Sequence, residues 1–228
     1  MRRIPFVNIH RHSFRREKQT ITVNNIYPGE GFAAFNGRNF YSVGLHPWHI
    51  KSHDENNEML VMVEEALDFE HVLYIGEAGL DKVVKTDFVE QNRIFEAQAF
   101  MAEEFGKPLI IHCVRAYNEV LQLHKKMHPE MKWILHGYNG NVETTKQLER
   151  RGIVFSFGEN LFSSDSKAVE SFLYLTIDKI FLETDEYKGG VKDIYEKGAQ
   201  LKNMPLEDLK KAIWDNFNKI KDSSYNVF

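Results

Sequence analysis

The sequence predicts an α/β fold of the TIM (β/α)8 type, a barrel that is irregular and reduced on its N-terminal side. Short apolar segments recur along the chain, and beyond about residue 55 they alternate with amphipathic segments of ten or more residues. Such alternation is typical of parallel βα units, and eight strands suggest a closed barrel. A length of 228 residues lies in the range of one α/β barrel, so we expect a single domain over residues 1–228.

The first three predicted strands lack convincing helices between them, and they cover residues 6–9, 20–24 and 40–44. Only the charged stretch 13–19 separates the first two, which leaves no room for a helix. The loop before the third strand is marked by Pro28, Gly29, Gly31 and Gly37. The barrel should therefore be irregular on this side.

The rest of the chain alternates regularly. Strands are expected at residues 72–75, 109–112, 133–136, 153–156 and 179–183. Helices are expected at residues 55–68, 87–105, 116–127, 142–151, 166–175 and 206–219. The last of these should turn Leu209, Ile213 and Phe217 inward.

Composition narrows the class of protein. Hydrophobic residues at 43% and charged residues at 27% are those of an ordinary globular protein. A net charge of -4 gives no global basic footprint, so a nucleic acid would have to be bound by local cations or by metal. The single Cys113 excludes an internal disulfide and fits a reducing compartment, and no stretch approaches the length of a membrane span. We expect a cytoplasmic protein that does not contact a membrane.

Titratable residues gather at the predicted strand ends. His10 and His12 are spaced two apart, so on a strand both imidazoles face the same side and form half of a metal site. The other strand ends carry His46, Glu77, His112, His136 and Asp185. In a barrel these ends meet at one rim, where the active site forms.

Each of these residues also has a structural explanation. Paired histidines are often incidental, and His112 or His136 could be buried imidazoles that hydrogen-bond to the backbone. The recurrence of such residues at one rim favours the metal site. Glu77 falls where we expect a tight turn, and an ionised Glu77 or Asp185 there needs a cation.

Imidazoles and carboxylates without thiolates suit Zn, Mn, Ni or Fe, with Mg possible. A carboxylate that bridges two ions about 3.5 to 4 Å apart would form a binuclear centre. Cys113 follows His112 directly and should face the opposite side of the strand as a small core residue.

Several ordered motifs resemble those of the TatD family, metal-dependent hydrolases of the amidohydrolase-like barrel class. They are Asn8-Ile9-His10-Arg11-His12, Gly44-Leu45-His46-Pro47, Gly76-Glu77-Ala78-Gly79-Leu80-Asp81, Pro108 to His112, Leu135-His136-Gly137, Glu183-Thr184-Asp185 and Asn216. The resemblance spans nearly the whole chain.

The resemblance implies a ligand set for up to two divalent ions per chain. His10, His12 and Asp185 would hold one ion, Glu77 would bridge, and His112 with His136 would complete the second. It also implies that a metal-bound water attacks a phosphodiester while Asp185 takes its proton, which makes Asp185 and Glu77 the catalytic residues. The family's expected activity is that of a deoxyribonuclease, mostly exonucleolytic, so the substrate would be DNA or a small phosphodiester.

The chain departs from the family pattern at several positions. Asn8 stands where an Asp is usual, Val114-Arg115 replaces Arg-Asp, Gly137 replaces Cys, and Glu186-Tyr187-Lys188 stands where a Pro normally follows. The metal ligands are kept while the segments expected to face the substrate are trimmed.

Four residues are candidate substrate contacts. His46 could donate to a phosphoryl oxygen, and Arg115 could pair with a phosphate bidentately. Trp48 and Tyr138 could stack on bases, but packing in the core or at the rim is the favoured explanation for both.

Two other functions remain open. One keeps the metal but acts on a lactone or cyclic amide, as in the wider amidohydrolase class. The other is a metal-binding protein without activity. Rates on activated esters, lactones and phosphodiesters would separate them.

Overall fold

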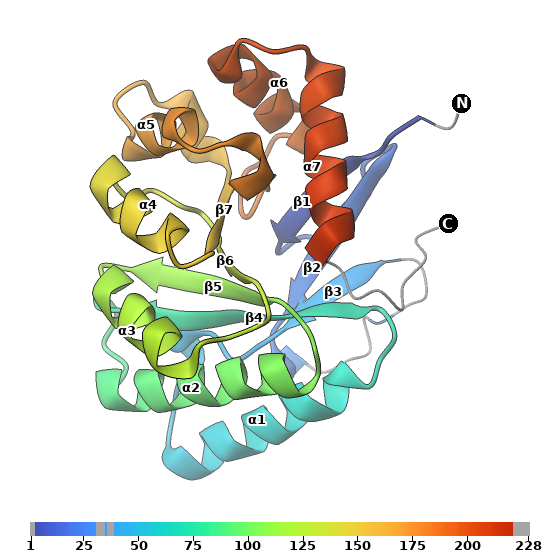
Figure 1. Ribbon diagram of the computed structural model, residues 1–228. Coiled ribbons are helices and arrows are strands. Elements are labelled where there is room, and N and C mark those ends of the chain that lie inside the picture. The colour runs from blue at the N-terminus through green and yellow to red at the C-terminus, as the bar shows by residue number, and fades with distance from the viewer. Residues whose placement is uncertain (1–2, 31–34, 36–38, 221–228) are drawn as a thin grey trace. The chain divides into compact units, whose positions relative to one another are not determined.

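The computed structural model describes residues 3–30, 35 and 39–220 (Figure 1). The chain divides into two compact units, Met1–Asn24 with His136–Ile220, and Asn25–Leu135 with Lys221–Phe228. Strand order in the eight-stranded sheet follows the sequence from β1 to β8. The predicted loop residues Gly31 and Gly37 lie outside the described residues, and the single domain stays a prediction.

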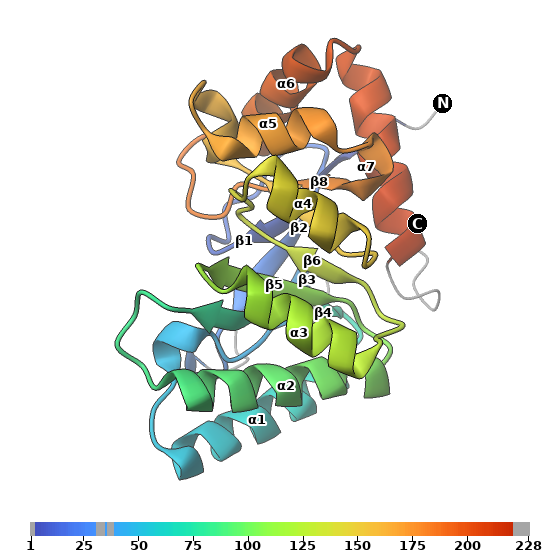
Figure 2. The same cartoon turned by 60° about the vertical axis from the view of Figure 1, so that its left-hand side comes forward.

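The described residues of the unit Asn25–Leu135 form four parallel strands and three helices. The strands are β3 (Phe40–Val43), β4 (Val72–Asp81), β5 (Leu109–Val114) and β6 (Trp133–Leu135). The helices are α1 (His53–Leu67), α2 (Phe88–Glu104) and α3 (Tyr117–Met127). Helix α2 packs on β4, and α1 lies beside α2 (Figures 1 and 2). All seven elements were predicted.

Local chemistry sets the ends of these helices. The Ser52 side chain accepts from the Glu55 N–H at the start of α1, and Glu55 reaches back to Ser52 in a capping box. Asp87 caps α2 by accepting from the Glu90 N–H. Gly106, at a φ of 63°, follows the end of α2 in the left-handed conformation that glycine adopts without strain.

Strand β4 is longer than predicted. We expected a tight turn around Glu77, yet the strand continues to Asp81, and its register against β5 shifts between Ile75 and Ala78. Gly76 and Gly79 have φ values of 130° and 149°, and a Cβ atom on either would lie within 2.4 Å of a backbone oxygen of β5. The glycines therefore mark a bulge and a close approach of two strands, so the predicted turn is wrong.

The unit Met1–Asn24 with His136–Ile220 carries the remaining strands and helices. The strands are β1 (Phe6–Arg11), β2 (Thr20–Ile26, whose last two residues belong to the other unit), β7 (Val154–Phe157) and β8 (Ile180–Leu182). The helices are α4 (Val142–Glu149), α5 (Lys167–Tyr174), α6 (Val191–Lys202) and α7 (Leu206–Ile220). A parallel bridge between Arg11 and Asp185 joins β1 to the segment after β8.

Helix α6 was not predicted from the sequence. It lies beside α7, as Figure 1 shows, and it also packs against β1. Its buried residues are Val191, Ile194, Tyr195, Gly198 and Ala199, a helical spacing that could have revealed it. The Tyr195 hydroxyl accepts from the Val7 N–H over 3.1 Å and donates to the Val7 carbonyl over 2.9 Å, which ties α6 to β1.

The N-terminal side is reduced as predicted. β1 and β2 are joined without a helix, and between β2 and β3 the described residues contain only the 3-10 turn Pro28–Glu30. In α7, Leu209, Ile213 and Phe217 are buried, as expected. Within residues 3–30 and 39–220, no helix combines the length and apolar character that crossing a membrane requires.

Candidate metal centre

One cluster of metal-ligating side chains lies in the unit that contains β1 and β8. A donor atom from each of His10, His136 and Asp185 falls within 4.8 Å of the others. β1 delivers His10, and the Asp185 N–H donates to the His10 carbonyl over 3.1 Å. Asp185 has a φ of 49°, a left-handed conformation that turns the chain sharply after β8.

His12 reaches the same carboxylate. Its Nε2 lies 3.3 Å from Asp185 Oδ1, and the Nε2 of His10 lies 3.8 Å from the same oxygen. The i, i+2 spacing therefore has the predicted effect, because both imidazoles face one point. His10 is fully buried, whereas the side chains of His12 and Asp185 are 37% and 36% exposed, so solvent and substrate can reach this side of the cluster.

A second cluster lies in the unit Asn25–Leu135 and consists of His46, Glu77 and His112. Glu77 Oε1 is 3.0 Å from His46 Nε2 and 2.8 Å from His112 Nδ1. The Glu77 residue is only 3% exposed. A carboxylate this deeply buried requires positive charge or strong hydrogen bonding close to it.

Asn25 holds the backbone at Glu77. Its Oδ1 accepts from the Glu77 N–H over 2.7 Å and from the Ser42 hydroxyl over 3.0 Å. Side chains of β2 and β3 thus fix the position of the β4 bulge. No sequence signal pointed to this role, because an Asn at the end of a strand has many explanations.

Asp81 is a further residue that sequence reasoning left without a role. Its Oδ2 lies 3.1 Å from His112 Nε2 and accepts from the Trp48 indole N–H over 2.7 Å, while Oδ1 accepts from the Val83 N–H. Burial alone would raise the pKa of Asp81, but the hydrogen bonds from Trp48, Val83 and His112 together lower it. The ionised carboxylate orients the His112 ring between Glu77 and itself.

Glu183 has a similar place in the other unit. The residue is fully buried, Oε1 accepts from the Gly137 N–H over 2.6 Å, and the same oxygen lies 3.4 Å from His136 Nδ1. Its second oxygen, Oε2, is buried and has no hydrogen-bond partner among the described residues. Its position in the Glu-Thr-Asp motif was the signal that could have singled it out.

The structure also places the four residues predicted as substrate contacts, and Cys113. His46, predicted as a substrate contact, lies in the cluster with Glu77, and the exposed Arg115 directly follows β5. Tyr138 packs in the core, the explanation favoured from the sequence, because its side chain is buried and its hydroxyl contacts Thr145. Trp48 is 59% exposed, so its predicted contact with a base stays open. Burial raises the pKa of the Cys113 thiol to about 12, which fits its prediction as a non-ligand.

The donor chemistry of both clusters fits divalent cations. Each cluster joins two imidazoles to one carboxylate with no thiolate, a set that suits Zn, Mn, Fe or Ni. His46, Glu77, His10 and His136 lie in the interior, where an uncompensated carboxylate would be costly. Each unit thus contains a candidate metal-binding group among its described residues.

Comparisons with known proteins also point to a metal-dependent hydrolase. The family model described as TatD related DNase matches residues 30–221. An uncharacterized metal-dependent hydrolase of Haemophilus influenzae is 25% identical over 197 residues, which cover 77% of this chain and 74% of that protein. The human 3'-5' RNA nuclease TATDN2 is 30% identical over 148 residues, 62% of this chain and 19% of that protein.

The fold is also that of a solved relative. The crystal structure of YjjV, a TatD homologue from Escherichia coli, superimposes with a TM-score of 0.81 at 18% identity and covers 95% of this chain and 97% of that one. The fold class is therefore the predicted barrel of parallel βα units, and the site is that of a metal-dependent hydrolase. The chain belongs to the TatD family.

Proposed function

We propose that this protein is a nuclease that hydrolyses phosphodiester bonds of DNA with the help of divalent cations. The observation that carries the proposal is the pair of clusters, His10-His136-Asp185 and His46-Glu77-His112, each with donors within 4.8 Å of one another. His12 would add a ligand to the first cluster. A divalent cation bound there lowers the pKa of coordinated water and stabilises charge on the phosphoryl oxygens.

Asp185 and Glu77 have different proposed tasks. Asp185 is 36% exposed and lies between His12 and His10, so it can accept a proton from the attacking water while it faces the substrate. Glu77 is buried between His46 and His112 and keeps the negative charge that holds the second cation. A cytoplasmic location, from the single Cys113, stays a prediction.

DNA is proposed as the substrate because the family model carries the description TatD related DNase. RNA is the second candidate, since the human relative TATDN2 is named as a 3'-5' RNA nuclease. Exonucleolytic action, as the sequence resemblance implies, is part of the proposal for either nucleic acid.

The test compares substrates on one protein preparation. Protein purified without added metal is analysed for its elements, stripped with a chelator and reloaded with Zn, Mn or Mg. Initial rates are then measured on end-labelled DNA and RNA of one sequence, on bis(4-nitrophenyl) phosphate and on an activated lactone. We expect metal-dependent cleavage of DNA from one end. Turnover of the lactone alone, or metal binding without any turnover, would overturn the proposal.

A further inference from the structure

Trp48 contacts the second cluster through both its backbone and its side chain. Its backbone N–H donates to His46 Nδ1 over 3.1 Å, and its indole N–H donates to Asp81 Oδ2 over 2.7 Å. The same oxygen of Asp81 lies 3.1 Å from His112 Nε2. Trp48 is therefore connected, directly or through one carboxylate, to both imidazoles that flank Glu77.

The indole ring of Trp48 also packs on both imidazoles. Its centroid lies 5.1 Å from that of His46 and 5.9 Å from that of His112, with angles of 87° and 76° between the ring planes. Edge-to-face packing of this kind is favourable between aromatic rings. Trp48 is 59% exposed, yet its indole N–H donates to Asp81, which is only 2% exposed. A hydrogen bond to a buried carboxylate is a stronger restraint than one to solvent.

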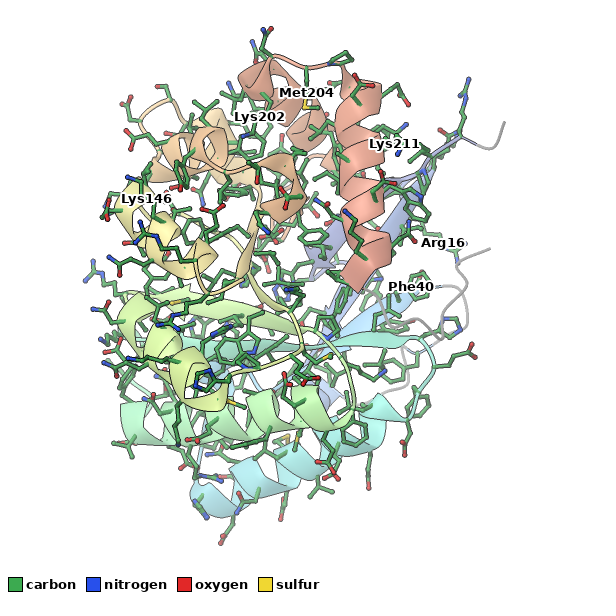
Figure 3. All side chains as sticks on the ribbon, in the orientation of Figure 1. Arg16, Phe40, Lys146, Lys202, Met204 and Lys211 are labelled. Atoms are coloured by element: carbon green, nitrogen blue, oxygen red, sulfur yellow. The ribbon has the colours of Figure 1, made fainter. Side chains whose placement is uncertain are left out.

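Helix α2 fixes the backbone on both sides of this hydrogen bond. The fully buried Gln91 accepts from the Asp81 N–H over 2.8 Å and donates to the Asp81 carbonyl over 3.0 Å. Gln91 also donates to the Thr86 hydroxyl over 2.8 Å, and that hydroxyl donates to the Pro47 carbonyl over 2.9 Å. Side chains fill the space between α2 and the strands of this unit (Figure 3). Because Pro47 precedes Trp48, one buried amide fixes the chain at both partners.

We infer that Trp48 is a positioning residue for a cation held by Glu77 and His112, and that it acts through Asp81. With Nε2 of His112 facing Asp81, Nδ1 of the same ring faces Glu77 Oε1 at 2.8 Å. A carboxylate beside one ring nitrogen fixes the orientation of a ligating histidine, and here the indole N–H fixes that carboxylate. The inference rests on the metal binding of the proposed function and not on its substrate.

Trp48→Phe tests the inference, because phenylalanine keeps an aromatic ring but lacks the indole N–H. Zinc is titrated into metal-free protein against a chromophoric chelator, a readout that needs no turnover. Loss of the direct partner of a ligating histidine weakens metal binding roughly 10- to 100-fold, so for Trp48, one contact further away, we expect roughly 3- to 10-fold at one of the two sites.

Trp133→Phe is the matched control, since it makes the same exchange in the same unit. The indole nitrogen of Trp133 is buried and has no hydrogen-bond partner among the described residues. Because Trp133 is only 1% exposed, its exchange should lower the free energy of unfolding and leave zinc affinity at the wild-type value. The pair of variants thus separates a loss of stability from a loss of positioning.

The route through Asp81 is tested with Asp81→Ala and with the double variant. Asp81→Ala alone should weaken zinc binding by roughly 10-fold or more. In protein that already carries Asp81→Ala, Trp48→Phe should change zinc affinity by less than about 2-fold, because the indole N–H has lost the group through which it acts.

Fluorescence provides a signature of the same contact. The chain has three tryptophans, and the ring of Trp48 lies 5.9 Å from that of His112. Addition of Co²⁺ to metal-free protein should quench the emission of the wild type and of Trp133→Phe, whereas Trp48→Phe should lose the larger part of this quenching.

Equal zinc affinity in Trp48→Phe and wild type would overturn the inference. Additive losses in the double variant would overturn it as well, and so would cobalt binding that leaves the emission of Trp48 unchanged. Zinc binding by the wild type without hydrolysis of any phosphodiester would instead contradict the nuclease proposal and leave the positioning role of Trp48 in place.

Discussion

The carboxylate of Glu183 lies against the imidazole of His136, with Oε1 3.4 Å from Nδ1. The side chains of both residues are buried, and the Gly137 N–H donates to the same Oε1 over 2.6 Å, which fixes the carboxylate. A carboxylate beside one ring nitrogen of a histidine orients the ring and makes the other nitrogen a better ligand. For the proposed metal site of His136, His10 and Asp185, Glu183 would therefore act as a positioning residue.

Glu183→Gln should lower the affinity of the His136 cluster for zinc by roughly 10- to 100-fold. Glutamine keeps the size of the side chain and an oxygen for the Gly137 N–H, but it carries no charge. Affinity is measured by titrating zinc into metal-free protein against a chromophoric chelator. Glu149→Gln is the matched control, because this half-buried carboxylate accepts from the Tyr174 hydroxyl and is not part of either cluster. Equal zinc affinity in Glu183→Gln and wild type would rule out the positioning role.

Asp185→Asn should abolish turnover, a loss of at least roughly 10²- to 10⁴-fold in kcat, because an amide cannot take the proton. The fold should survive, since asparagine tolerates the left-handed conformation that Asp185 adopts at a φ of 49°. Rates on bis(4-nitrophenyl) phosphate and thermal unfolding by circular dichroism check both statements. Asp165→Asn, at an exposed position of the same unit, should keep full activity. A variant of Asp185 that still turns over would show that another group accepts the proton.

Asn8, which replaces the usual Asp of the family, has a structural task. Its Nδ2 donates to the Thr184 hydroxyl over 2.7 Å, and its Oδ1 accepts from the Thr184 N–H over 3.0 Å. The buried side chain thus ties β1 to the segment that carries Asp185. An uncharged amide is suited to this pairing because it offers one donor and one acceptor.

Asn8→Ala should lower the free energy of unfolding by about 1–3 kcal/mol, since it leaves the buried Thr184 N–H without an acceptor. Urea unfolding of the metal-free protein measures the change without interference from bound metal. Asn218→Ala is the control, because among the described residues Asn218 donates to the Trp214 carbonyl one turn earlier in α7. That exchange should be nearly neutral, since alanine favours a helix. If both variants unfold alike, the Asn8–Thr184 pair contributes little.

The positions of the ligand residues at the strand ends could be predicted, because each follows directly after a short apolar run in the sequence. Largely apolar runs at residues 6–9 and 109–111 lead directly into His10 and His112, and in parallel strands such ends share one edge. The i, i+2 spacing of His10 and His12 likewise predicted that both imidazoles would face one point. Periodicity also predicted the buried face of α7.

The residues behind the ligands could not be predicted in the same way. Asp81 and Glu183 act through contacts with His112 and His136 that join positions 31 and 47 residues apart. A glycine motif suggested a turn at Glu77, but whether Gly76 and Gly79 make a turn or let two strands approach depends on the neighbouring strand. Helix α6 was missed although its pattern is helical, because the residues after Asp185 read as a shortened loop.

Glu90 in α2 provides a pH-dependent contribution to stability that is separate from the metal clusters. Arg93 donates to both carboxylate oxygens, over 2.9 and 2.6 Å, Asn56 of α1 donates over 2.9 Å, and His53 lies 3.6 Å away. The hydrogen bonds from Arg93, followed by that from Asn56, lower the pKa of Glu90 to about 2. Since Asn56 and His53 belong to α1, the carboxylate links the two helices.

Because the pKa of Glu90 is lower in the folded than in the unfolded chain, its ionised form stabilises the fold at every pH above the unfolded value of about 4.3. Glu90→Gln should therefore lower the free energy of unfolding at pH 7 by about 1 kcal/mol, near the upper value for such pairs. The difference from wild type should shrink as the pH falls from about 4 toward 2, where the wild-type carboxyl also becomes neutral. Urea unfolding of both proteins at pH 7, 4 and 3 measures this difference in the free energy of unfolding. Glu143→Gln is the control, because it removes an exposed ion pair with Lys146. A difference that stays constant over this range would show that Glu90 acts through packing and not through its charge.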